Sequence, residues 1–211
     1  MTRYKNRIKA FLYFHGIELA PQFSHQQSHW SKRFIDWLES ISLKQESGKQ
    51  SLMTLIQEVK HSRESLLKIT KQIRTLSRTE AYRENVRLLR SIPGIALLTA
   101  ITILTELERM DRFRNIDHLC GMVGLVPSTD SSGDNPKVGD ITPRGHHILR
   151  SAIIESAWIA VRINPALMKC YHNYCKRMEP NQAIVRIAKK LLSRIRYVLT
   201  NKQPYVCSVV K

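Results

Sequence analysis

A long run of regularly spaced apolar residues between positions 49 and 78 limits the possible folds more than any other stretch. The spacing alternates between three and four residues, and neither Pro nor Gly interrupts it. The seam positions are Leu52, Leu55, Val59, Ser62, Leu66, Ile69, Ile73 and Leu76. Seven of these eight residues are apolar, which predicts one long helix with a coiled-coil seam of about four heptads.

A seam of this length needs a partner to cover it. The partner could be the chain's own earlier helical segments, 3–15 and 30–41, or a second copy of the chain. Because those two segments are too short to cover the whole seam, we expect the chain to form a homo-oligomer through residues 48–80. Ser62 would weaken the middle of the seam and help to fix its register.

The charge balance favours an anionic partner. The chain has 211 residues with 34 Lys and Arg against 17 Asp and Glu, and a formal net charge of +17. Such a positive field attracts nucleic acid first and an anionic membrane surface second. Residues 134–211 carry 14 basic and 4 acidic side chains, a net of 14 − 4 = +10. We therefore expect DNA as the partner, held mainly by the C-terminal part.

No apolar run approaches the roughly 20 residues of a membrane-spanning helix, and the N-terminus has no secretory signal pattern. We expect a protein with no membrane partner, located in the cytoplasm and associated with the nucleoid. Cys170 and Cys175 flank His172, but no second ligand pair accompanies them, so we expect reduced thiols and no metal site. The acidic residues between 106 and 117 do not share one helix face and are not expected to form a catalytic cluster.

The remaining segments also have helical periodicity, at 82–107, 146–162, 164–178 and 181–199. They predict a mainly α fold with a helical and coiled-coil arm before a helical domain. We divide the chain into a helical linker region at 1–47, a coiled-coil helix at 48–80 and a DNA-binding domain at 81–211. The segment 124–145 is too long for a plain connector and predicts an irregular functional loop or a small β-hairpin, with 138–142 pairing to 125–128.

Pro93-Gly94-Ile95 separates two apolar helices and is similar to a helix–hairpin–helix motif. The glycine would let the backbone approach a phosphate, and the free N–H groups of the second helix would receive the anion. Ala96 stands where that motif usually has a second glycine. The alternative is an ordinary pair of antiparallel helices with a Pro-Gly turn.

Several motifs in order resemble one known family. They are Arg90-Ser-Ile-Pro-Gly-Ile95, Arg112-Phe113, the segment from His118 to Pro127, Ser131-Ser132-Gly133, Ile141-Thr-Pro-Arg-Gly145, Leu149-Arg150 and Ala188-Lys-Lys-Leu-Leu192. This pattern resembles the C-terminal transposase domain of the DEDD-type bacterial insertion-sequence transposases, also described as bridge-RNA-guided recombinases. The resemblance covers about residues 82–200.

The resemblance implies a serine that attacks a DNA phosphodiester and becomes covalently linked to it. The matching residue is Ser132, with Ser131 as the alternate. It also implies DNA contacts, guide RNA as a further partner, and DNA transposition or recombination as the function. The residues expected to bind DNA are Pro93, Gly94, Ile95, Thr142, Arg144, Gly145, Arg150, Arg186, Lys189 and Lys190.

In that family, an N-terminal RuvC-like domain supplies four acidic metal ligands, and this sequence has no matching segment. We therefore expect no cofactor in this chain, and Mg²⁺ only together with that domain. A serine hydroxyl needs a base or a metal to activate it. His146 and His147 follow the loop and are candidates for the base. Without the acidic domain the chain is expected to be catalytically incomplete, and a non-catalytic DNA-binding module is the alternative.

Overall fold

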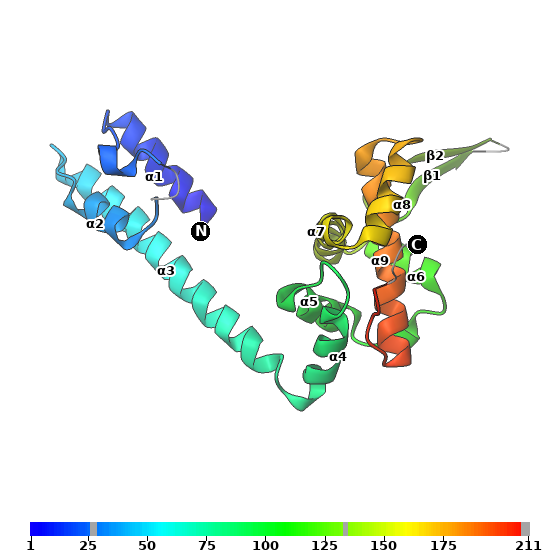
Figure 1. Ribbon diagram of the computed structural model, residues 1–211. Helices are drawn as coiled ribbons and strands as arrows, with labels where there is room; N and C mark the ends of the chain where they lie inside the picture. The colour runs from blue at the N-terminus through cyan, green and yellow to red at the C-terminus, as the bar shows by residue number, and fades with distance from the viewer. Residues whose placement is uncertain (26–28, 133–134, 208–211) are drawn as a thin grey trace. The chain divides into compact units, whose positions relative to one another are not determined.

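The computed structural model describes residues 1–25, 29–132 and 135–207, and the fold is mainly α, as predicted (Figure 1). The described residues contain helices α1 to α9 and one two-stranded sheet. The chain divides into two compact units, Met1–Gln72 and Ile73–Lys211. The first unit combines the predicted linker region with most of the predicted coiled-coil helix.

The first unit contains α1 (Thr2–Phe14), α2 (Lys32–Ser40) and most of α3 (Glu46–Leu76), with a short 3-10 turn at Pro21–Phe23. Its core joins apolar residues from all of these elements. They are Ile8, Leu12, Phe23, Phe34, Ile35, Leu38, Leu52, Ile56 and Val59. The core therefore includes only the N-terminal half of α3, because the buried residues of that helix end at Val59.

The buried face of α3 differs from the predicted seam at one position. Ile56 is fully buried, whereas Leu55 is half-buried. The steps from Leu52 to Ile56 and Val59 are four and three residues, so the helix presents a core face shifted by one residue. Further along α3, Leu66 is 54% exposed and Ile69 is 51% exposed. The predicted seam continues there without a partner among the described residues of the first unit.

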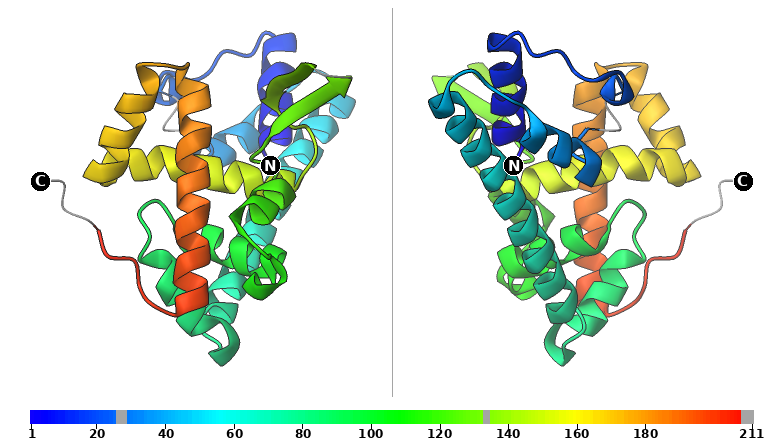
Figure 2. Two further views of the ribbon diagram at one scale, coloured as in Figure 1. Left: turned by 90° about the vertical axis from the view of Figure 1, so that its right-hand side faces the viewer. Right: turned by 90° about the vertical axis from the view of Figure 1, so that its left-hand side faces the viewer.

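The second unit contains α4 (Glu80–Arg90), α5 (Leu97–Leu107), α6 (Ile116–Val123), α7 (His147–Ile163), α8 (Pro165–Cys175) and α9 (Pro180–Asn201). A short 3-10 turn, η3 (Met110–Arg112), precedes α6. Helix α9 is central: it packs against α4, α6, α7 and α8, and α7 crosses it (Figure 2). Its buried residues are Ala183, Ile184, Ile187, Ala188, Leu191, Leu192, Ile195, Val198 and Leu199. This stripe agrees with the periodicity of 181–199.

The predicted β-hairpin is present and longer than the sequence indicated. Strand β1 (Pro127–Ser132) pairs antiparallel with β2 (Asn135–Ile141). The register pairs Pro127 with Ile141 at the base and Ser132 with Asn135 at the far end, with an irregularity between Pro127 and Thr129. In Figure 1 the hairpin projects from the helices of its unit.

Side-chain caps fix where several helices of the second unit begin. Asn115 accepts a hydrogen bond from the His118 amide at 2.9 Å at the start of α6. Asn164 accepts one from the Leu167 amide at 3.0 Å, and Pro165 takes the first position of α8. Asn is a favoured residue at the start of a helix, and Pro is tolerated at the first helical position. None of the helices in the described part of the chain is long and apolar enough to cross a membrane.

Candidate nucleic-acid interface

The hairpin is anchored to the helical core at its base by Arg150. This side chain, on the first turn of α7, donates from Nη1 to the Thr142 carbonyl oxygen at 2.6 Å and to the Gly124 carbonyl oxygen at 3.5 Å. The Thr142 amide in turn donates to the Val126 carbonyl oxygen at 2.9 Å. The guanidinium of Arg150 is half-buried and holds the two ends of the hairpin together. Predicted as a phosphate ligand, it has an internal role in this structure.

Two glycines allow the chain to cross itself beneath the hairpin. Gly124 ends α6 with φ +81°, and Gly145 precedes α7 with φ +119°. A Cβ on Gly145 would lie 2.5 Å from the Gly124 Cα, and a Cβ on Gly124 would lie 2.5 Å from the Arg144 carbonyl oxygen. Gly145 is therefore required for this close backbone contact, independently of any contact with DNA.

Arg144 differs from Arg150 because its side chain is exposed and forms no ion pair with another described residue. Its backbone amide donates to Thr142 Oγ1 at 3.2 Å, which fixes the turn before α7. Of the two arginines predicted to hold phosphates here, Arg144 is the more exposed.

Both ring nitrogens of His146 have partners. Nδ1 accepts a hydrogen bond from the Leu149 amide at 3.2 Å and so caps α7, while Nε2 lies 2.7 Å from Glu106 Oε2. An accepting Nδ1 places the proton of a neutral imidazole on Nε2, which donates to the carboxylate. His146 therefore joins the end of α5 to the start of α7. His147 is exposed.

Ser132 ends β1, and Ser131 precedes it and pairs with Pro136. Five residue steps separate Ser132 from Pro127 at the base, which corresponds to roughly 16 Å along a strand. Thr142, Arg144 and Arg150 all lie at the base. The structure brings those three residues together and leaves the candidate nucleophile at the other end of the hairpin. Gly133, the last residue of the predicted motif, lies outside the described residues.

A groove of about 870 Å³ opens beside the base of the hairpin. It is lined by the hairpin, α7, and the residues before and within the first half of α9. Ile154, Trp158 and Met178 give it an apolar floor, and Arg186 and Lys189 are its basic residues. Lys190 is exposed on the same helix. The structure thus places two of the three predicted basic residues of α9 next to the hairpin.

The Pro93-Gly94-Ile95 turn lies against α7. A Cβ on Gly94 would lie 2.2 Å from the Ser156 carbonyl oxygen and 3.0 Å from the Ala160 amide nitrogen. Ile95 is buried, and Gly94 has φ +87°. Close packing of the turn against α7 therefore explains why position 94 is a glycine. The sequence motif did not indicate this contact. Contact of this turn with DNA stays a prediction.

The acidic residues between 106 and 117 are dispersed among separate partners. Glu106 contacts His146, Glu108 lies 3.8 Å from Arg112, and Asp111 pairs with Arg109. The Arg109 guanidinium lowers the pKa of the Asp111 carboxyl. Among the residues that the structure describes, no group of three or more His, Cys, Asp or Glu could hold a metal ion. Burial raises the pKa of the Cys120 thiol, and Lys189 partly opposes that shift.

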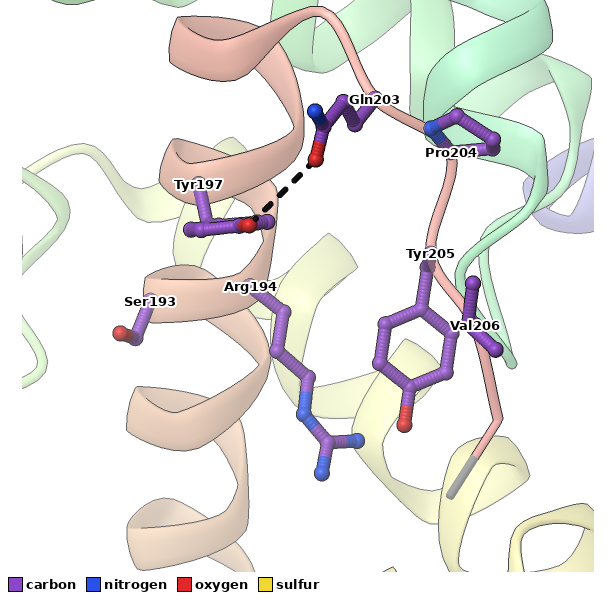
Figure 3. Close-up of a pocket in the computed structure, with 7 residues that line it drawn as sticks. All are labelled: Ser193, Arg194, Tyr197, Gln203, Pro204, Tyr205 and Val206. Atoms are coloured by element: carbon purple, nitrogen blue, oxygen red, sulfur yellow. Dashed lines mark hydrogen bonds between the residues drawn. The ribbon is translucent and has the colours of Figure 1, made fainter.

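The structure shows two features of the second unit that were not predicted from the sequence. The first is the segment after α9, where the Tyr205 amide donates to Ser91 Oγ at 2.7 Å and Asn164 Nδ2 donates to Tyr205 Oη at 3.2 Å. Figure 3 shows Arg194 and Tyr197 of α9 on one side of a pocket and Gln203 to Val206 on the other. The Arg194 guanidinium lies 4.9 Å from the centre of the Tyr205 ring.

The second feature is a row of arginines at 83, 87 and 90, with two more at 74 and 78. The steps of four and three residues place the first three on one face of α4, and this spacing was the signal that could have revealed them. They line a groove with the start of α5.

Comparison with known proteins identifies the class to which this region is similar. Residues 86–172, from α4 to α8, match the model of a family described as Transposase IS116/IS110/IS902 family. The match includes the Pro-Gly turn, the hairpin and its anchor on α7. The matched region is thus similar in sequence to this transposase family.

Individual relatives extend the similarity along the chain. The chain is 25% identical over 216 residues to a putative transposase of Sinorhizobium fredii, covering 100% of this chain and 50% of the relative. It is 26% identical over 211 residues to the transposase for insertion sequence element IS1111A of Coxiella burnetii, covering 96% and 55%. A protein of insertion element IS110 from Streptomyces coelicolor is 32% identical over 107 residues, covering 50% and 26%. The chain therefore spans about half the length of the first two relatives.

Proposed function

We propose that this chain is the DNA-binding part of an IS110-family insertion-sequence transposase and that it acts in DNA transposition through Ser132. The observation that carries the proposal is the family match over residues 86–172, which contains the whole β-hairpin and its anchor. The similarity to transposases along the full chain supports it. The net charge of +17 supports a nucleic-acid substrate.

In the proposed reaction, Ser132 Oγ attacks a phosphorus atom of the DNA backbone. A serine–phosphate ester bond forms, the bond from phosphorus to one sugar oxygen breaks, and the serine proton ends on that departing sugar hydroxyl. The reverse attack by a sugar hydroxyl of another strand end releases the serine. No phosphodiester energy is lost, so the exchange needs no oxidant, reductant or nucleotide.

Activation of the hydroxyl is proposed to come from outside the hairpin base. Both ring nitrogens of His146 are already hydrogen-bonded. The base of the hairpin also lies roughly 16 Å from Ser132 along the strand. The resemblance implies that the acidic residues and Mg²⁺ of a RuvC-like domain complete the site. Guide RNA is a further proposed partner on the same basis.

The basic residues near the hairpin are proposed to hold the DNA backbone. Arg144 offers an exposed guanidinium whose planar donors suit a phosphate. Arg186 and Lys190 are exposed on α9, and Lys189 lines the groove beside the hairpin. Arg150 supports this surface at the hairpin base, because its Nη1 donates to backbone carbonyls. The proposed cellular place is the cytoplasm, on the nucleoid.

The test for the nucleophile is a covalent adduct. The chain, alone and mixed with a partner that supplies the acidic domain, is incubated with duplex DNA of the element ends and then denatured. We expect a protein–DNA adduct with the wild type and with Ser131→Ala, and none with Ser132→Ala. An adduct that persists in Ser132→Ala and disappears in Ser131→Ala would move the nucleophile to the alternate residue.

The second candidate function is a DNA-binding module without chemistry. The observation that favours it is that His146, one of the two candidate bases, is used as a helix cap and a partner of Glu106. Salt-sensitive DNA binding without an adduct, even when the acidic domain is supplied, would establish this reading and exclude the catalytic one.

Self-association is proposed to occur through the exposed half of the α3 seam. Leu66 and Ile69 lie on the predicted seam and are more than half exposed within the first unit. An exposed apolar stripe on a long helix is stabilised by a matching helix, and the second copy of this chain carries the same stripe.

A further inference from the structure

Five arginines line one groove of the second unit, away from the hairpin. The groove measures about 740 Å³ and lies among the end of α3, helix α4, and the start of α5. Its lining residues are Arg74, Ser77, Arg78, Arg83, Val86, Arg87, Arg90, Ser91, Leu97 and Pro204. We call it the arginine groove.

The charge of the arginine groove is mostly uncompensated. Arg87 pairs with Glu84 at 2.7 Å, and this pair is exposed. For Arg74, Arg78, Arg83 and Arg90, no ion pair is found among the described residues, and all four are exposed. Lys202 adds a further cation nearby, where its Nζ donates to Asn85 Oδ1 at 2.7 Å. Such a set of like charges repels itself and is stabilised by an anion that spans it.

Backbone donors reach the same groove. The first N–H groups of an α-helix have no partner within the helix, and they attract anions. At the start of α5, Ala96 provides no side-chain cap, and Leu97 lines the groove. The arginines and Leu97, at the start of α5, therefore line the same groove although they belong to different elements.

The Pro-Gly turn itself does not supply this site. The side of Gly94 that would carry a Cβ faces α7, where it lies against the Ser156 carbonyl. In a helix–hairpin–helix motif the glycine is expected to approach the phosphate, whereas here the residues that line an open groove are the arginines of α4 and Leu97 at the start of α5.

We propose that the arginine groove binds the phosphodiester backbone of a nucleic acid as a second contact, distinct from the hairpin surface. Arg83 to Arg90 extends about 10 Å along α4, the axial distance of roughly three consecutive phosphates of one strand. Guanidinium forks match phosphate oxygens in pairs. The proposal rests on the proposed function for the nature of the polymer, and deepens it by naming a contact that the hairpin does not make.

The position of the groove supports a separate contact. Arg186 and Lys189, beside the hairpin, lie in the first half of α9, whereas Pro204 follows the end of that helix and lines the arginine groove. Lys189 lies 12 residues before the end of α9 at Asn201, which corresponds to about 18 Å along the helix. This distance exceeds the length of one side chain, so a single residue does not serve both surfaces.

The test measures how the affinity of the full chain for nucleic acid depends on salt. The variant is Arg83→Gln with Arg90→Gln, which removes two exposed arginines of α4 that form no ion pair among the described residues. The matched control is Arg162→Gln with Arg177→Gln, which removes the same charge from exposed arginines on α7 and after α8. The probes are a fluorescent duplex DNA and a fluorescent single-stranded RNA, titrated by anisotropy between about 50 and 200 mM NaCl.

We expect the groove variant to weaken binding more than tenfold at low salt and to reduce the slope of log K against log salt by about 1.8, because two phosphate contacts are lost at about 0.9 each on duplex DNA. The control variant should retain the wild-type slope. A loss confined to the duplex assigns the groove to DNA, and a loss confined to the single strand assigns it to RNA. Unchanged thermal unfolding of both variants shows that the fold is intact.

A groove variant that binds both probes with the wild-type slope overturns this inference and leaves the proposed function standing. Equal loss in groove and control variants also overturns it, since net charge would then explain the effect. A wild-type chain that binds neither probe overturns both the inference and the proposed function. Failure of the Ser132 adduct alone affects only the proposed chemistry, because the groove contains no part of the hairpin.

Discussion

Gly94 illustrates how one residue can fit two explanations until its neighbours are known. The sequence Pro93-Gly94-Ile95 predicted a tight turn, and the structure confirms that turn between α4 and α5. The physical requirement for glycine comes from α7, about 60 residues later in the chain, whose Ser156 carbonyl occupies the place of a Cβ. Local sequence predicts the turn, but a contact so distant along the chain has no local signal.

Replacing Gly94 with Ala is expected to lower the free energy of unfolding by about 3 kcal/mol or more. The new Cβ would lie 2.2 Å from the Ser156 carbonyl oxygen, and Ala would be strained at φ +87°. Urea unfolding followed by circular dichroism measures the change. The control is Gly121→Ala, within α6, where no atom lies within 4 Å of the new Cβ.

Gly121→Ala should leave stability unchanged or raise it by about 0.5 to 1 kcal/mol, because Ala is the better helix former. Equal stability of the two variants would show that Gly94 does not pack tightly against α7.

His146 gives a second prediction at the scale of one residue. His146→Ala removes the cap of α7 and the contact with Glu106. The free energy of unfolding should therefore fall by about 1 to 1.5 kcal/mol. His146→Asn should recover most of this loss, since Asn is a good N-cap. His147→Ala, at the exposed neighbouring position, should change stability by less than about 0.5 kcal/mol. A large effect at His147 and none at His146 would contradict the assignment.

Helix α3 shows what periodicity can and cannot predict for an element. The pattern correctly predicted a single long helix, and the bounds 49–78 differ from Glu46–Leu76 by only two or three residues. The pattern did not reveal that Ile56 is buried in place of Leu55, because both are apolar and adjacent. Only the packing of α1 and α2 distinguishes them, and those contacts are made by residues far away in sequence.

The exposed half of α3 gives a prediction about assembly. Leu66→Glu places a charge on the seam and should shift the chain from oligomer to monomer in sedimentation velocity. Leu67→Glu is the matched control: Leu67 is 63% exposed on the same turn but lies off the seam, so the oligomer should persist. Both substitutions suit a solvent-facing helix. If both variants dissociate equally, or if the wild type is already monomeric, the seam does not hold copies together.

The hairpin shows that a local structure can be predicted while the positions of its residues in space are not. The small, polar residues of 124–145 predicted a loop or a short hairpin with 138–142 pairing to 125–128, and the strands at Pro127–Ser132 and Asn135–Ile141 extend farther toward the tip than expected. The placement of Ser132 far from Arg144 and Arg150 was not predictable, because spacing in sequence does not show which residues stand at the tip and which at the base. The motif residues were found together in sequence and lie apart in space.

At the scale of the whole chain, function depends on how charge is distributed over surfaces that several helices build together. The excess of basic residues predicted a polyanionic partner, but the groove on α4 was missed because its arginines belong to three local segments. The fold places Arg74, Arg90 and the start of α5 around one space. Pattern reading describes each helix well, while surfaces built from several helices appear only when the tertiary structure is known.

The last prediction concerns divalent metal ions. In the described part of the chain no group of three or more His, Cys, Asp or Glu is suited to a metal, and the proposed function assigns Mg²⁺ to a domain outside this chain. DNA binding by the chain alone should therefore not require Mg²⁺. Since Mg²⁺ competes with basic side chains for phosphates, its removal with excess EDTA should tighten binding slightly. Anisotropy titrations at matched ionic strength, with and without EDTA, measure this, and thermal unfolding should be the same in both buffers. Binding that is lost in EDTA, or a melting temperature raised by Mg²⁺, would mean that the chain itself holds the metal, and the division of chemistry between this chain and an acidic domain would then be wrong.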